Sequence, residues 1–180
     1  MTAVPTTQRE VLVSGSAKGY GAAASTSIHK HVGGVPVATT TTGTDSACTD
    51  GTMYLGEIAL EAGMRLTGIS YLIGSTGGTD KVVVYLYDSA GTVLANSLLT
   101  GTTVGTTATF QRVAFTAAYE VPDDGRYYVG VIFNGATAKF RTQAFGDHDA
   151  GSVTSTFGTS AAITPPATFT ASKAPYAMTY

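Results

Sequence analysis

Short apolar runs alternate with clusters of Gly, Asp and Asn along the chain from about residue 52 onward. The runs recur roughly every ten to fifteen residues, which is typical of an antiparallel β-sandwich. The runs expected to form strands are residues 52–60, 64–73, 81–88, 92–97, 107–116, 126–133 and 137–144, with weaker ones at 152–157 and 167–171. We therefore predict an all-β, jelly-roll-like antiparallel sandwich over residues 51–162.

The spacing of side chains within a strand predicts which of them face the core. Thr67, Ile69, Tyr71 and Ile73 occupy alternate positions of residues 64–73. Alternate positions of a strand share one face of its sheet. We expect the other face of each strand to be exposed or half-exposed, as antiparallel sheets allow.

Turn residues separate the predicted strands. Asp88 and Gly91 stand between residues 81–87 and 92–97, and the Asn134-Gly135 pair stands between residues 129–133 and 137–142. Both patterns favour β-hairpins, because Asp and Asn bond to nearby backbone and Gly adopts positive φ. Pro122 begins a further turn that leads into the strand at residues 126–133.

The two ends of the chain have a different pattern. Residues 1–50 are rich in Gly and Thr, with a run of four threonines at 39–42 and only brief apolar groups. Thr and Val favour extended backbone over helix, so we predict an extended N-terminal arm. Residues 163–180 contain Pro165, Pro166 and Pro175, which interrupt strand pairing. We predict an extended C-terminal tail there.

Composition excludes several classes of protein. Thr, Ala and Gly supply 31, 25 and 22 of the 180 residues, and only 12% of residues are charged. The 10 Lys and Arg are scattered and the net charge is −2, so no basic stripe is present to bind nucleic acid. Cys48 is the single cysteine, which excludes an intrachain disulfide. No apolar run approaches the roughly 20 residues of a membrane span, and no secretory signal is visible.

One motif resembles a dinucleotide-binding turn. Residues 11–21 read VLVSGSAKGYG, the strand and glycine pattern of short-chain dehydrogenases. That motif needs a helix behind it to receive the pyrophosphate, whereas residues 22–36 contain β-branched residues and two glycines. We interpret the motif as part of the arm and predict no cofactor.

Histidines and aspartates are the candidate metal ligands. His29 and His31 share one side of an extended segment, and His148 lies between Asp147 and Asp149, but no pattern brings the two groups together. The candidates for calcium are the turn aspartates, which turn chemistry explains equally well: Asp45, Asp50, Asp80, Asp123, Asp124, Asp147 and Asp149. We predict no metal site.

No motif for nucleophilic or acid–base catalysis is present. The chain has no Gly-x-Ser-x-Gly sequence, and Cys48 lies in a Ser/Thr/Asp loop without an identifiable base. The four glutamates, Glu10, Glu57, Glu61 and Glu120, form no evident pair for glycoside hydrolysis. We predict that the protein is not an enzyme and has no catalytic residues.

Five tyrosines lie in predicted strands and have two possible roles. They either pack in the core or form a platform on which sugars stack, and the core is the favoured interpretation. The residues are Tyr71, Tyr85, Tyr87, Tyr127 and Tyr128.

Two segments carry a resemblance to a known family. Residues 64–97 contain an Asp-Ser-x-Gly turn between two strands, and residues 119–135 contain a proline turn followed by Tyr-Tyr. Over about residues 52–145 the chain resembles the β-sandwich domains of virion structural proteins of tailed bacteriophages. The resemblance implies a capsid decoration (cement) protein or a module of a tail fibre, and it implies a scaffold with no transferable site residues.

The resemblance and the composition lead to one expected function. We expect a non-enzymatic phage virion protein, assembled in the host cytoplasm, that binds the major capsid protein or other virion proteins through its sandwich and arms. A homo-oligomer is expected, with a trimer favoured, and no partnership with nucleic acid or membrane. The alternative is a carbohydrate-binding or adhesin module of the tail-fibre type.

Overall fold

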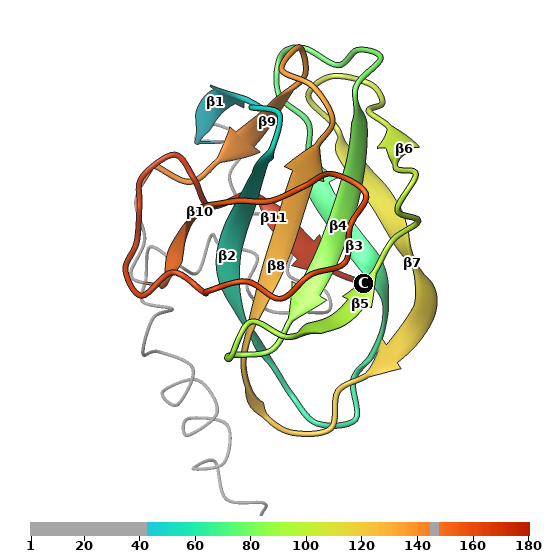
Figure 1. The fold of residues 1–180 in the computed structure, drawn as a ribbon, viewed down its shortest axis with the longest axis vertical. Coiled ribbons are helices and arrows are strands. Elements are labelled where there is room, and N and C mark those ends of the chain that lie inside the picture. The colour runs from blue at the N-terminus through green and yellow to red at the C-terminus, as the bar shows by residue number, and fades with distance from the viewer. Residues whose placement is uncertain (1–42, 145–147) are drawn as a thin grey trace, which may run out of the picture.

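The computed structural model describes residues 43–144 and 148–180, and the described chain is all-β with no helix (Figure 1). The predicted strands at residues 52–60, 64–73, 81–88, 92–97, 107–116, 126–133, 137–144 and 152–157 all correspond to observed strands, whereas residues 167–171 form no named strand. The strands are β1 (Thr44–Ala47), β2 (Thr52–Leu60), β3 (Arg65–Leu72), β4 (Lys81–Tyr87), β5 (Val93–Asn96), β6 (Thr102–Thr103), β7 (Phe110–Glu120), β8 (Gly125–Phe133), β9 (Lys139–Thr142), β10 (Ala150–Thr154) and β11 (Ala177–Thr179).

The strands form two layers, and all strand pairs are antiparallel. One layer is a six-stranded sheet in the order β10-β2-β8-β4-β5, with β6 beside β4. The other layer contains a three-stranded sheet, β11-β3-β7, and the pair β1-β9. Single bridges from Ile73 to Phe140 and from Thr142 to Pro175 connect β9 to that sheet. This arrangement is consistent with a β-sandwich.

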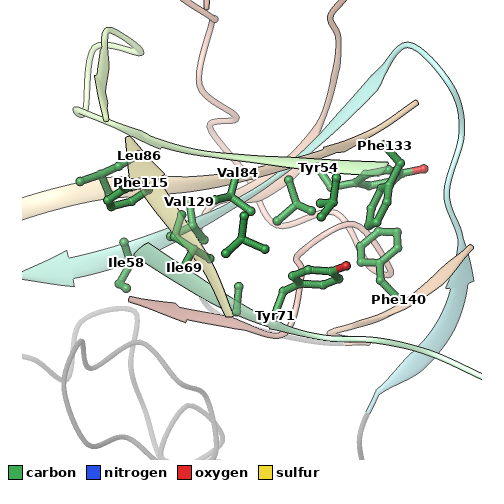
Figure 2. Close-up of a cluster of buried hydrophobic side chains, with 14 of the residues drawn as sticks. Tyr54, Ile58, Ile69, Tyr71, Val84, Leu86, Phe115, Val129, Phe133 and Phe140 are labelled. Carbon is green, nitrogen blue, oxygen red and sulfur yellow. The ribbon is translucent and has the colours of Figure 1, made fainter. Parts of the chain in front are cut away.

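The main core lies between the two layers. The six-stranded sheet contributes Val84 and Val129, and the opposite layer contributes Ile69 and Phe115, as Figure 2 shows. At one end of this core the ring of Tyr71 lies edge-on to that of Phe133, with 5.9 Å between their centroids. Contacts of this kind between aromatic side chains add to the hydrophobic gain of burial.

The outer face of the six-stranded sheet is also buried, so the expectation of one exposed face per strand is wrong for β4 and β8. Successive residues of β4 alternate between the two sides: Val84 packs in the main core and Val83 in a second cluster on the outer face. Ile132 of β8 belongs to that second cluster. Figure 1 shows the cause, because the segment that follows β10 crosses over β2, β8 and β4.

This covering segment, residues 155–170, contains no named strand and is held by tyrosine hydroxyls as well as by packing. The Tyr85 hydroxyl donates to the carbonyl of Thr159 (2.8 Å), and the Tyr128 hydroxyl to that of Pro166 (3.3 Å). The Ile163 amide donates to the carbonyl of Gly91 (2.9 Å). A side chain at position 91 would collide with the Ile163 carbonyl.

The predicted turns have different outcomes. The hairpin at Asp88 is confirmed, because β4 pairs with β5 and the Asp88 carboxylate accepts from the amides of Ala90 and Thr92. The hairpin at Asn134-Gly135 is wrong, because β8 pairs with β2 and β4 whereas β9 pairs with β1. The Asn134 side chain instead accepts from the Lys81 amide of the neighbouring strand (2.6 Å), and the chain then changes layers.

The proline-led turn after residue 120 also joins the two layers. It leads from β7 of the three-stranded sheet into β8 of the six-stranded sheet. The Tyr127 hydroxyl donates to the carbonyl of Asp123 (2.8 Å) and fixes this corner.

The register of β3 changes where it meets β7. A single residue of β3 separates Leu66 from Gly68, whereas four residues of β7 separate the partners of these two. Phe115, one of those four, bridges to Ser97, the residue after β5. The bulge reverses the alternation of β3, so Leu66 and Ile69 both enter the core although they are three residues apart. It also brings β7 beside the edge of the six-stranded sheet.

Both terminal segments take part in the sandwich where they are described. The expectation that prolines keep residues 163–180 out of any ladder is wrong, because β11 pairs with β3 and Pro175 bridges to Thr142. Proline lacks a donor but keeps its carbonyl, and β11 begins two residues after Pro175. Residues 44–47, assigned from sequence to the arm, form β1. The rest of the predicted arm, residues 1–42, lies outside the described residues.

Charged substitutions on either side of the six-stranded sheet test this double burial. Val84→Asp and Ile132→Asp each place an unpaired carboxylate at a site with 0% exposure. We expect each to lower the free energy of unfolding by about 4 kcal/mol or more. Leu98→Asp is the control, because Leu98 is 63% exposed. Urea denaturation monitored by circular dichroism measures the effect, and wild-type stability of Ile132→Asp would show that the outer face is open.

Candidate functional site

The described residues that carry chemistry gather in three polar clusters. The first joins Cys48 to Asp80, the second surrounds Arg126, and the third surrounds Asp45. Each cluster connects loops or strands that are far apart in the sequence.

The Cys48 cluster anchors the loop between β8 and β9. Asp80 is 9% exposed, and its carboxylate accepts from the amides of Thr137 (2.8 Å) and Ala138 (2.7 Å). The Cys48 thiol donates to the Ala138 carbonyl (2.9 Å). Burial, and then the charge of Asp80, raise the pKa of Cys48 to about 12. The thiol is therefore protonated at neutral pH and is no nucleophile.

Gly135 completes the same cluster. A Cβ atom at this position would collide with the Asp80 carboxylate. The Asn134-Gly135 pair is a hairpin signal in the sequence. In the structure its glycine instead allows the backbone to approach the Asp80 carboxylate closely.

The Arg126 cluster lies where β2, β8 and the start of β10 meet. Arg126 Nε lies 3.0 Å from Glu57 Oε1, and Arg126 Nη2 lies 2.6 Å from Asp149 Oδ2. The Asp149 amide donates to Glu57 Oε2 (3.0 Å), and Glu57 faces Tyr128 across β2 and β8. A hydrogen bond with Tyr128, and then the charge of Glu57, raise the pKa of Arg126.

The geometry of this cluster is that of an ion-pair clamp. Glu57 is 6% exposed and Arg126 is 57% exposed, so one cation at the surface compensates a buried carboxylate and a half-buried one. The Glu57 carboxylate is bonded to the guanidinium and to the Asp149 amide, and the Asp149 carboxylate is bonded to the guanidinium. The arrangement holds the first residues of β10 against β2.

His148 lies beside this clamp. It is 3% exposed, and its ring stands edge-on to that of Phe169, with 5.3 Å between the centroids. His148 therefore packs between the start of β10 and the end of the covering segment. His29 and His31, the other two histidines, lie outside the described residues, as does Asp147.

The Asp45 cluster connects β1 to β9 and to the loop after β3. The Asp45 carboxylate accepts from the amide (2.8 Å) and the hydroxyl of Ser75, and lies near Lys139 (3.6 Å) and Arg141 (3.7 Å). Burial raises the pKa of Asp45, but the bonds from Ser75 and the charges of Arg141 and Lys139 outweigh it and hold the pKa of this carboxyl below its usual value. The carboxylate is ionised at neutral pH.

The remaining candidates from the sequence do not converge. Glu61 and Glu120 are exposed, and Asp124 in the turn before β8 accepts from the amide of Ala62 in the turn before β3 (2.7 Å). Within residues 43–144 and 148–180, no three His, Cys, Asp or Glu side chains are grouped so as to hold a metal ion. The glycine motif at residues 14–21 and Glu10 lie outside the described part of the chain.

The tyrosines of the strands pack in the core, as favoured from the sequence. Their exposed fractions range from 0% to 7%, so these five do not form a platform for sugars. Sequence reasoning missed the role of their hydroxyls. The sequence did carry a signal for this role. The apolar runs at residues 82–87 and 127–133 are continuous, which is typical of strands covered on both faces, so tyrosine hydroxyls on these strands meet a covering segment.

Comparison of the chain with models of protein families, with curated proteins and with solved structures finds no match. In the part of the chain that the structure describes, no helix is long and apolar enough to cross a membrane.

The state of Cys48 can be measured by thiol labelling. We expect the folded protein to react with a disulfide reagent at pH 8 at least about 100-fold more slowly than the protein in urea, because the folded thiol is buried and protonated. The measurement is the absorbance of the released chromophore. Equal rates in the two states would contradict the buried position of Cys48.

The ion-pair clamp can be tested by removing its cation. Arg126→Met leaves Glu57 charged and buried, and we expect a loss of about 2 kcal/mol in the free energy of unfolding, less than for a fully buried pair because Arg126 is largely exposed. Adding Glu57→Gln should restore part of the loss. Arg65→Met, at an exposed arginine of β3, is the matched control. Equal urea midpoints for Arg126→Met and Arg65→Met would show that the clamp contributes nothing.

Proposed function

We propose that the protein is a non-enzymatic structural protein of a phage virion, and that it acts as a capsid decoration protein binding the particle surface. The proposal rests on the hydrogen bonding of one thiol and two carboxylates that could otherwise take part in catalysis. The Cys48 thiol and the carboxylates of Glu57 and Asp80 are all bonded within the fold. The proposal therefore assigns binding to the surface of the sandwich-like body and to the residues before β1.

The composition supports the same role. A decoration protein must remain folded outside the cell and contact several neighbours at once. A body with two buried faces on its larger sheet and only 12% charged residues suits the first need. The Gly- and Thr-rich residues 1–42 suit the second, because a segment that binds a neighbouring subunit gains from being tethered to it. The partners proposed are the major capsid protein and further copies of this chain, with a trimer favoured.

Particle fractionation tests the proposal. We expect the full chain to sediment from its source lysate in a megadalton particle together with major capsid proteins, and mass spectrometry identifies the companions. A variant lacking residues 2–42 should keep the strands intact but fail to join the particle. Its circular dichroism spectrum and its urea midpoint provide the control for folding.

Two outcomes would overturn the proposal. One is recovery of the full chain as a free species of one to three copies, in which case a glycan panel would test the carbohydrate-binding alternative. The other is undiminished incorporation of the shortened variant, which would exclude the role of residues 2–42.

A further inference from the structure

The last seven residues complete the second layer of the sandwich. This closing segment, residues 174–180, lies between β9 and β3. On the β9 side, the Gln143 amide donates to the Ala174 carbonyl (2.8 Å) and the Tyr176 amide to the Arg141 carbonyl (2.8 Å). On the β3 side, β11 pairs with residues 69–71. The segment thus connects two strands that otherwise meet at the bridge from Ile73 to Phe140 and at the neighbouring bond from the Gly74 amide to the Lys139 carbonyl (2.8 Å).

The position that receives the segment is shaped for it. The Tyr180 backbone oxygen accepts from the Thr67 amide (2.6 Å), and the Tyr180 amide donates to the Gly68 carbonyl (3.1 Å). A side chain at Gly68 would collide with the Val113 carbonyl of β7 and with the end of the Tyr180 side chain, and Arg112 lies over the Tyr180 ring at 4.8 Å. The part of β3 where its register with β7 changes therefore accommodates the end of the segment.

The connection that leads into the closing segment is strained. Residues 171–173 form a turn, and Ser172 has a φ of 62°. The left-handed region disfavours side chains with a Cβ atom. Before this turn, residues 155–170 contain no named strand, and the chain is anchored next to the turn by the bridge from Ala150 to Phe169. A short strained connection ahead of a separable strand favours exchange of that strand between copies.

One group of the closing segment is poorly satisfied. The Thr179 hydroxyl is buried, with 1% of the residue exposed, and it has no hydrogen-bond partner among the described residues. A buried hydroxyl without a partner lowers the gain from docking. Release of the segment is therefore less costly than its number of backbone bonds suggests.

We propose that copies of this protein exchange the closing segment, so that residues 174–180 of one chain occupy the position between β9 and β3 of the next. The backbone bonds of the segment can form between chains as they do within one, and opening of the turn at Ser172 relieves its backbone strain while breaking the bond from the Ser172 amide to the Gln143 carbonyl (2.8 Å). The partner is a second copy of the chain. This inference deepens the proposed homo-oligomer, and it is tested on purified protein, independently of any particle.

A pair of engineered cysteines reports which chain donates the segment. Ser70 and Met178 face each other directly across β3 and β11, at the typical Cα separation of about 5.5 Å that a disulfide spans. The Ser70→Cys, Met178→Cys protein is equilibrated at increasing concentrations, oxidised and analysed on a non-reducing gel. We expect disulfide-linked oligomers whose fraction rises with concentration. Each single variant is the control for accidental crosslinks, and Cys48 stays in place because it is buried.

Two variants of the turn, each in the cysteine-pair background, test the role of strain. Ser172→Val adds a β-branched side chain at positive φ and should raise the crosslinked fraction at least threefold, whereas Ser172→Gly should lower it. Ala108 is the other described non-glycine residue at positive φ (56°), in the loop before β7. Ala108→Val is therefore the matched control, with comparable strain at a site that no exchange would open.

Three outcomes would overturn the inference. The first is a single intrachain disulfide at every concentration in all variants. The second is equal crosslinking of Ser172→Val and Ala108→Val. The third is crosslinking by the single-cysteine controls to the same extent as by the pair. Particle fractionation of the wild-type chain is a separate measurement, so failure of strand exchange is distinguishable from failure of the virion role.

Discussion

The central strands of the six-stranded sheet, β2, β8 and β4, are apolar on both faces, and the rest of the structure follows from the need to cover both. Each large side chain that becomes fully buried contributes about 1.5–3 kcal/mol, and both sides of β4 and β8 carry such residues. The second layer covers the inner face. The outer face is covered by residues 155–170, a segment without named strands.

A covering segment without strand pairing must satisfy its backbone by other means. Pro165 and Pro166 remove two amide donors that would need partners. The carbonyls of the segment still need hydrogen-bond donors. Tyrosine hydroxyls of the sheet donate to two of these carbonyls, those of Thr159 and Pro166. Tyrosine suits this position because its ring belongs to the apolar cluster while its hydroxyl reaches the segment above.

The polar clusters serve the same architecture. Asp80 holds the loop that carries the chain from β8 to β9, and the clamp of Glu57, Arg126 and Asp149 holds β10 at the sheet edge from which the covering segment departs. A buried carboxylate requires such partners, since its desolvation is costly without them. Among the described residues, Cys48, Asp80 and Glu57 thus bond to segments that are distant in the sequence. This distribution is what the proposed structural role depends on.

The sequence by itself determined the all-β class and the positions of most strands, because strand periodicity, β-branched residues and turn residues are local properties. The hairpin at Asp88 was predictable for the same reason: its signals act within a few residues. The core position of the strand tyrosines also followed from local pattern.

Only the tertiary structure decided which strands pair and what covers them. The Asn134-Gly135 turn has the local signature of a hairpin, but Asp80, more than 50 residues away, draws its loop out of the sheet. The bulge between Leu66 and Gly68 appears only when β3 meets β7. The prolines near the end discouraged a strand locally, yet β11 forms because β9 and β3 present backbone groups on either side of the last residues. Register and layer order depend on contacts between distant segments, and no local propensity contains them.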